Sequence, residues 1–164
     1  MKTASGFTLV EIMIAITLVG ILAMVGAPLT NSWSTSADMV TARGVLRQAI
    51  TRAKTVAVRN EFGLTENKSA AAICIASDKK IEVRRANNSN NSASCNTNGG
   101  TVVWKASISQ TLAVKRGTTA FSCACFDNKG QILTSAVAAC SACGANTNLT
   151  LSATGVDDEA VNIY

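Results

Sequence analysis

The chain has 164 residues, of which 48% are hydrophobic and 15% are charged, and its formal net charge is +5. This length and composition fit one domain rather than two. Histidine is absent, which removes the commonest general base and the commonest metal ligand, so we expect neither an enzyme nor a cofactor.

The apolar excess lies at the N-terminal end. After Glu11, the only polar side chain from residue 12 to residue 28 is Thr17. At a rise of ~1.5 Å per residue, the run 7–29 spans roughly 34 Å, which is enough to cross a bilayer core. The hydrophilic leader 1–6 carries Lys2 and no acidic residue, and this charge favours a cytoplasmic N-terminus with the rest of the chain exported. We therefore expect 7–29 to be a transmembrane helix.

The same helix is expected to continue through residues 30–60. Apolar positions recur there at helical spacing, with basic residues largely around the remaining surface, which predicts an amphipathic half that packs on a domain. The predicted stripe consists of Met39, Leu46, Ile50, Ala53 and Ala57, flanked by Ala42, Ala49 and Val56. Pro28 should kink the helix, because proline removes an intrahelical hydrogen bond and its ring clashes with the preceding turn.

Residues 61–164 are predicted to form an antiparallel β domain. Short runs with a period of two are separated by clusters of Ser, Asn, Asp and Gly. The predicted strands are 72–76, 80–84, 101–104, 111–115, 119–126, 149–152 and 160–164, with a hairpin turn at 77–79. The stretch 87–100 is polar and of low complexity, so it should be a surface loop that buries no core, pinned by Cys95.

All six cysteines lie in the exported part, and an even number there predicts disulfides. They are Cys74, Cys95, Cys123, Cys125, Cys140 and Cys143. Cys123 and Cys125 would point to one face of a strand and could meet Cys140 and Cys143 in two nearby bridges, which would leave Cys74 with Cys95. Six cysteines allow 15 pairings, so this grouping is a hypothesis.

The same cysteines allow two other interpretations. Cys123, Cys125, Cys140 and Cys143 could form a four-thiolate zinc site, or Cys140 and Cys143 could be a redox motif. Oxidising compartments favour disulfides over zinc. A thioredoxin-like domain would usually place a cis-proline beside its motif, and the only proline is Pro28. We therefore expect no metal site.

Two pairs of basic residues are candidates for contact with DNA phosphates, Arg84 with Arg85 and Lys115 with Arg116. The ordinary alternative is that such pairs are solvated at strand ends, where they discourage edge-to-edge pairing of sheets.

The leader that ends in Gly6, followed by Phe-Thr-Leu-Val-Glu and an uncharged run, resembles the class III signal of type IV pilins and type II secretion pseudopilins. The resemblance implies that a prepilin peptidase cuts between Gly6 and Phe7 and that the new N-terminus is methylated. Glu11 and Pro28 then occupy the fifth and twenty-second mature positions, which match the family pattern. The segments ARGVLRQAITRAKTVAVRNE and KKIEVRR and the turn 126–130 also resemble minor subunits of the FimT and FimU type and the H-type pseudopilin.

What the resemblance implies is an α+β fold, in which a long N-terminal pilin helix packs on an antiparallel β-sheet or β-sandwich. Glu11 would pair with the positive N-terminus of a neighbouring subunit during assembly. The expected partners are the prepilin peptidase, the inner-membrane assembly platform and other minor and major pilins. The expected place is the inner membrane, with the globular domain periplasmic, and later the pilus at the cell surface.

Three functions follow from the resemblance. The first is a minor pilin that primes type IV pilus assembly and is incorporated at or near the tip, serving twitching motility or adhesion. The second is an H-type minor pseudopilin of type II secretion, and the third is a DNA-binding minor pilin for natural transformation.

Overall fold

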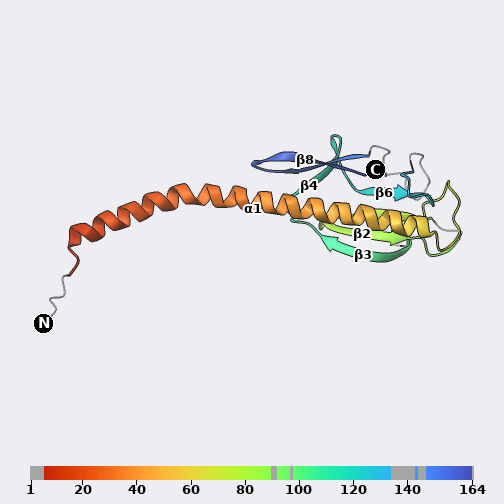
Figure 1. Cartoon of the computed structure of the whole chain (residues 1–164), viewed down its shortest axis with the longest axis horizontal. Helices are drawn as coiled ribbons and strands as arrows, with labels where there is room; N and C mark the ends of the chain where they lie inside the picture. Colours follow the sequence, from red (N-terminus) through yellow and green to blue (C-terminus); the bar gives the residue numbers. More distant parts are fainter. Residues whose placement is uncertain (1–5, 90–91, 97, 134–142, 144–146, 164) are drawn as a thin grey trace.

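The computed structural model of the chain describes residues 6–89, 92–96, 98–133, 143 and 147–163, and for 26–31 it describes the backbone alone. A helix of 51 residues, α1 (Leu9–Arg59), precedes all the strands. The described strands are β1 (Ala71–Ile75), β2 (Lys80–Arg85), β3 (Thr101–Ser107), β4 (Ala113–Arg116), β5 (Thr119–Ala120), β6 (Cys123–Phe126), β7 (Asn148–Ala153) and β8 (Val156–Asn162). The N-terminal half of α1 extends beyond the strands and its C-terminal half runs along them (Figure 1). The predicted α+β fold is confirmed.

The two halves of α1 differ in burial. Every described residue from Phe7 to Val25 is exposed, and the first buried helix residue is Met39. From there the buried positions follow the predicted stripe: Met39, Ala42, Leu46, Ala49, Ile50, Ala53 and Ala57. The helix ends where Asn60 adopts a left-handed conformation and its N–H donates to the Ala57 carbonyl.

Among the residues that the structure describes, no helix has a stretch long and apolar enough to cross a membrane. Pro28 lies within α1, but its side chain is outside the described part, so a kink caused by it stays a prediction. In Figure 1 the N-terminal half of α1 is curved.

The strands form two antiparallel sheets of four strands each. One has the order β3-β2-β1-β6 and the other the order β5-β4-β7-β8. We call them sheet A and sheet B. Both contribute to one core with the stripe of α1, through residues such as Ile73 and Val83 of sheet A and Leu149 and Val161 of sheet B. Alanines on both sides of this contact have no exposed surface, among them Ala53, Ala72 and Ala124, and small side chains let the helix and strands approach closely.

The prediction of one strand over 119–126 is wrong. The chain crosses between the sheets inside this segment: the Phe121 N–H donates to the Val114 carbonyl in sheet B, and the Ser122 carbonyl accepts from Ile75 in sheet A. Phe121 thus bonds to a strand of sheet B and Ser122 to a strand of sheet A. Accordingly, β5 belongs to sheet B and β6 to sheet A.

The last strand was predicted at 160–164, but β8 covers Val156–Asn162. It starts directly after Gly155, whose φ of +83° forms the turn from β7. The three acidic residues at its start gave no period-two apolar signal. Tyr164 is outside the described residues.

The predicted turn at 77–79 is present, because the Lys79 N–H donates to the Ala76 carbonyl at 3.0 Å and the Ala76 N–H to the Lys80 carbonyl at 3.0 Å. The described residues of 87–100 form no strand, as expected for a loop. The expectation that this loop buries no core is wrong at Ala93. Its side chain is fully buried, and its N–H donates to the Ser69 carbonyl at 2.7 Å.

Candidate processing and assembly site

The peptide bond between Gly6 and Phe7 lies outside regular structure, just before α1 begins. Phe7 is 81% exposed, and apart from the chain neighbours of Gly6 no described residue has an atom within 4 Å of the position that a Cβ on Gly6 would occupy. An uncovered, non-helical peptide bond is what a peptidase can take into its active site. The geometry at Gly6 and Phe7 is therefore compatible with the cleavage that the sequence predicts.

Thr8 fixes where α1 starts and thereby where Glu11 lies. Its backbone is extended, and its Oγ1 accepts a hydrogen bond from the Glu11 N–H at 3.3 Å. The Thr8 carbonyl accepts from Ile12 at 3.3 Å. The sequence interpretation missed Thr8, although Thr-Leu-Val-Glu has the spacing of a capping box.

Glu11 thus stands in the first turn of α1, where the helix dipole favours a negative charge. Its side chain is exposed and takes part in no ion pair or hydrogen bond with another described residue. The residues around it, such as Val10 and Ile14, are exposed and apolar. A carboxylate on an apolar surface is costly to remove from water unless it is paired, so Glu11 can take a cation that comes from another molecule.

Five of the six cysteines fall in the described part. Cys74 is bridged to Cys95 with Cα atoms 5.5 Å apart, and Cys123 to Cys143 with Cα atoms 5.0 Å apart. Cys125 is also in a disulfide, and its sulfur lies 3.8 Å from that of Cys143. Both pairings agree with the predicted grouping, while Cys140 lies outside the described residues. A sulfur in a disulfide is not a thiolate ligand, so these five do not offer a thiolate zinc site as they stand.

The structure does not bring the four candidate DNA contacts together. Arg84 and Arg85 lie on β2 of sheet A, whereas Lys115 and Arg116 lie on β4 of sheet B. Successive side chains of a strand point to opposite faces, which separates Arg84 from Arg85 as well.

Three of these four residues also have partners within the molecule. Arg84 is paired with Glu82 at 2.8 Å, and Arg85 is paired with Glu61. Arg116 lies over the ring of Phe121 at 4.7 Å, and burial lowers its pKa from the ordinary value. The carboxylates offset part of the positive charge that a phosphate would meet at Arg84 and Arg85.

Residues 1–27 match the family model of the prokaryotic N-terminal methylation motif. These residues include Gly6, Phe7, Thr8 and Glu11. The match supports a type IV pilin-like protein, and such a motif implies processing by a prepilin peptidase and assembly with other pilins. No curated protein matches the chain, and no solved structure matches it either.

Proposed function

We propose that this chain is a minor pilin that primes assembly of a type IV pilus and is incorporated at or near the tip with other minor pilins. One observation carries the proposal. The methylation motif at 1–27 coincides with an uncovered Gly6–Phe7 bond and with an unpaired Glu11 on the first turn of a helix whose exposed surface up to Val25 is largely apolar.

In the proposed sequence of events, residues 7–29 insert in the inner membrane with residues 1–6 in the cytoplasm. Cleavage after Gly6 frees the α-amino group of Phe7, and methylation leaves this group basic. The globular domain then lies in the periplasm, where its cysteines are oxidised to disulfides.

The charge pair gives assembly a driving force. A carboxylate at the bilayer centre costs ~2.5 to 3.5 kcal/mol on insertion scales. Two opposite charges 4 Å apart attract by ~4 kcal/mol at an effective dielectric constant of 20. Pairing Glu11 with the N-terminal amine of a neighbour can therefore offset the cost that an isolated subunit bears, so association is favoured over remaining alone in the membrane.

The apolar surface of the N-terminal half of α1 has a role both before and after assembly. Before assembly, the side chains from Phe7 to Val25 contact lipid, and after assembly they pack against the helices of neighbouring subunits. An assembly role needs no catalytic group and no cofactor, which fits a chain without histidine.

The test is to shear surface filaments from cells that express the protein at its native level and to probe that fraction with an antibody. We expect processed protein in the sheared fraction. Glu11→Gln should lower its amount at least about tenfold, the ratio that ~1.4 kcal/mol produces. Asp38→Asn, the same chemical change elsewhere on α1, is the matched control and should leave the amount unchanged.

Two results would contradict the proposal. If processed protein stays in the envelope and never reaches the sheared fraction, the chain acts instead as an H-type pseudopilin of type II secretion. If the protein keeps residues 1–6 in cells with an active prepilin peptidase, it is not a pilin subunit at all.

We leave DNA binding outside the proposed function. Arg84, Arg85, Lys115 and Arg116 are spread over two sheets, and Arg84 and Arg85 are paired with carboxylates.

A further inference from the structure

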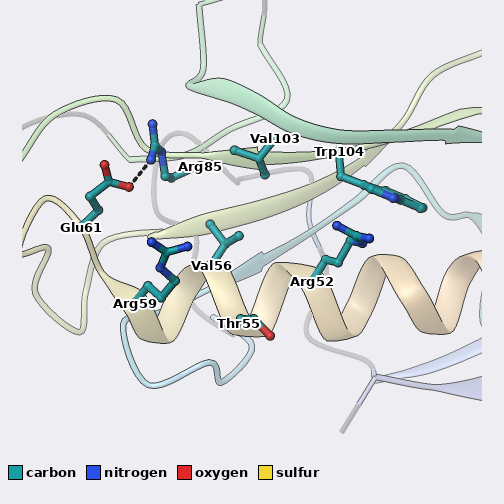
Figure 2. A pocket seen from close by; sticks show the side chains of 8 residues that line it. All are labelled: Arg52, Thr55, Val56, Arg59, Glu61, Arg85, Val103 and Trp104. Carbon is teal, nitrogen blue, oxygen red and sulfur yellow. Dashed lines mark hydrogen bonds and ion pairs between the residues drawn. The ribbon is translucent and has the colours of Figure 1, made fainter.

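A hollow lined by arginines lies between the C-terminal end of α1 and strands β2 and β3 (Figure 2). Its volume is about 320 Å³. We call it the basic groove, and it is lined by Arg52, Thr55, Val56, Arg59, Glu61, Arg85, Val103 and Trp104. None of these residues belongs to the processing and assembly site at the other end of α1.

A bulge in β3 shapes the floor of the basic groove. Val83 pairs with Trp104 and Arg84 pairs with Val102, so Val103 has no partner in the ladder. The extra residue allows two successive side chains, Val103 and Trp104, to line the same hollow. Because β3 is the edge strand of sheet A, the groove is open to solvent and Val103 remains 40% exposed.

The arginines of the groove have capacity for further carboxylates. Arg85 is paired with Glu61 and lies over the ring of Phe62. Arg52 lies 5.8 Å from the centre of the Trp104 ring. Among the described residues, no carboxylate forms an ion pair with Arg52 or Arg59. Guanidinium groups bind carboxylates with well-defined geometry, and the pair of Arg85 with Glu61 shows that the groove accommodates one.

The complementary charge is at the start of β8, directly after the turn from β7. Asp157 and Asp158 are exposed, and neither forms an ion pair with another described residue, whereas the next residue, Glu159, is paired with Arg43 of α1. We call residues 155–158 the acidic hairpin.

The acidic hairpin and the basic groove lie at different heights along α1. Ser36 borders the same shallow hollow as Gly155, Val156 and Asp157, whereas the groove is lined by helix residues from Arg52 to Arg59. At ~1.5 Å per residue, the two features are separated by about 24 to 35 Å along the helix axis. In Figure 1, β8 is drawn on one side of α1, and β2 and β3 on the other.

We propose that the acidic hairpin of one copy of this chain docks in the basic groove of a second copy. Such a contact is heterologous, so two neighbouring copies use one groove and one hairpin between them. Two parallel copies displaced along the helix axis by about 24 to 35 Å would bring the two features to the same height. The inference rests on the proposed function, because assembly through α1 is what holds copies parallel.

The contact is not expected to hold dilute copies together, because individual exposed ion pairs contribute little. It acts between copies that the membrane or a filament already keeps side by side, where the effective concentration is high. Its role is to select the neighbour and its axial offset, since complementary charges favour one register and like charges penalise others.

The experiment uses two differently tagged full-length copies expressed together in cells. One carries Thr55→Cys at the groove and the other Thr154→Cys beside the acidic hairpin, and a short bis-maleimide reagent is the probe. We expect a crosslinked dimer that contains both tags. The matched control replaces Thr154→Cys by Thr118→Cys, at an exposed turn between β4 and β5, and should lower the yield of the mixed dimer about tenfold. A second control, in which both copies carry Thr55→Cys, should lower the yield of crosslinked dimer by a similar factor.

Charge reversal tests the complementarity itself. Arg52→Glu with Arg59→Glu in the groove copy should lower the yield of the mixed dimer about tenfold. Asp157→Lys with Asp158→Lys in the other copy should restore it. Restoration by the swap would not occur if the variants had simply unfolded.

The two proposals fail in different ways. If the copies are processed at Gly6 but form no mixed dimer, the docking inference is overturned and the proposed function stands. Crosslinking of Thr55→Cys to another protein in place of the second copy also overturns the inference. Copies that keep residues 1–6 overturn the proposed function. In that case the docking inference is decided by the mixed dimer alone: its presence supports the inference and its absence overturns it.

Discussion

Glu82 is the most heavily engaged carboxylate among the described residues, and it lies on β2, the second strand of sheet A. It accepts from Arg84 Nε at 3.0 Å and from Arg84 Nη2 at 2.8 Å, and it pairs with Lys105 Nζ at 3.1 Å. The hydrogen bonds from Arg84, aided by Lys105, hold the pKa of Glu82 below its ordinary value. The charged form of Glu82 therefore stabilises the folded state.

Glu82→Gln should lower the free energy of unfolding by about 1 to 2 kcal/mol near neutral pH, because it leaves Arg84 and Lys105 without a charged partner. Since the folded pKa is depressed, the contribution is fully present above the unfolded pKa of about 4.3 and is lost as the pH falls through the folded value. Denaturant titrations of both proteins across this pH range measure it.

Asp158→Asn removes an exposed charge that has no ion pair among the described residues, and serves as the control. It should change stability far less than Glu82→Gln at every pH. A difference between wild type and Glu82→Gln that stayed constant down to the lowest pH would show that the ionised carboxylate is not the cause.

The turn after β6 is an element whose position depends on α1. Its Asp127 Oδ1 accepts from the Lys129 and Gln131 N–H groups, at 2.9 and 2.8 Å. Gly130 has a φ of +76°, and a Cβ there would lie 3.1 Å from Val58 Cγ2 on the helix. Gly130 is therefore required both by the turn and by the close approach to α1.

Gly130→Ala should destabilise the fold by about 1 to 2 kcal/mol from the left-handed backbone alone, with an added loss from the contact with Val58. Gly155→Ala is the matched control, because its φ is +83° and, apart from its chain neighbours, no described residue has an atom within 4 Å of the added Cβ. Denaturant titrations should show the larger loss for Gly130→Ala, and Val58→Ala in the same chain should remove the surplus. Equal losses at the two glycines would refute the packing of this turn on α1.

At the level of elements, the sequence predicts what depends on local periodicity. The stripe from Met39 to Ala57 was visible because apolar residues recur at helical spacing, and β1 and β2 because they alternate around a turn. The division into two sheets was not visible, since the crossing at Phe121 and Ser122 depends on which distant strand each residue meets. A period of two cannot report that choice.

The candidate sites also divide into those that a local sequence pattern predicts and those that depend on contacts between distant residues. Gly6, Phe7 and Glu11 form a contiguous motif, so the sequence alone was enough to select them. The basic groove depends on the unpaired Val103 and on the approach of β3 to Arg52, which no local pattern encodes. The pair Arg84 and Arg85 looked like one basic unit in the sequence, but a strand places the two side chains on opposite faces.

The whole molecule consists of two parts that differ in burial. The described helix surface before residue 26 is exposed and apolar, whereas all the buried residues of the core cluster lie between Met39 and Ile163. The two disulfides with both partners described also lie in this second part. The stability of the globular domain should then be independent of the exposed N-terminal half of α1.

A chain that begins at Ser32 should accordingly fold as a monomer, because it keeps every buried core residue and loses the exposed apolar half of α1. We expect its thermal midpoint to lie within about 3 °C of that of the full chain in detergent, since surface changes are worth within ~0.5 kcal/mol. Calorimetry and sedimentation measure the two properties. A chain that begins at Gln48 is the control, because it lacks Met39, Ala42 and Leu46, and loss of even one such side chain costs about 2 to 5 kcal/mol. If the longer fragment aggregated or melted as early as the shorter one, the exposed N-terminal half of α1 would have to contribute to the fold itself.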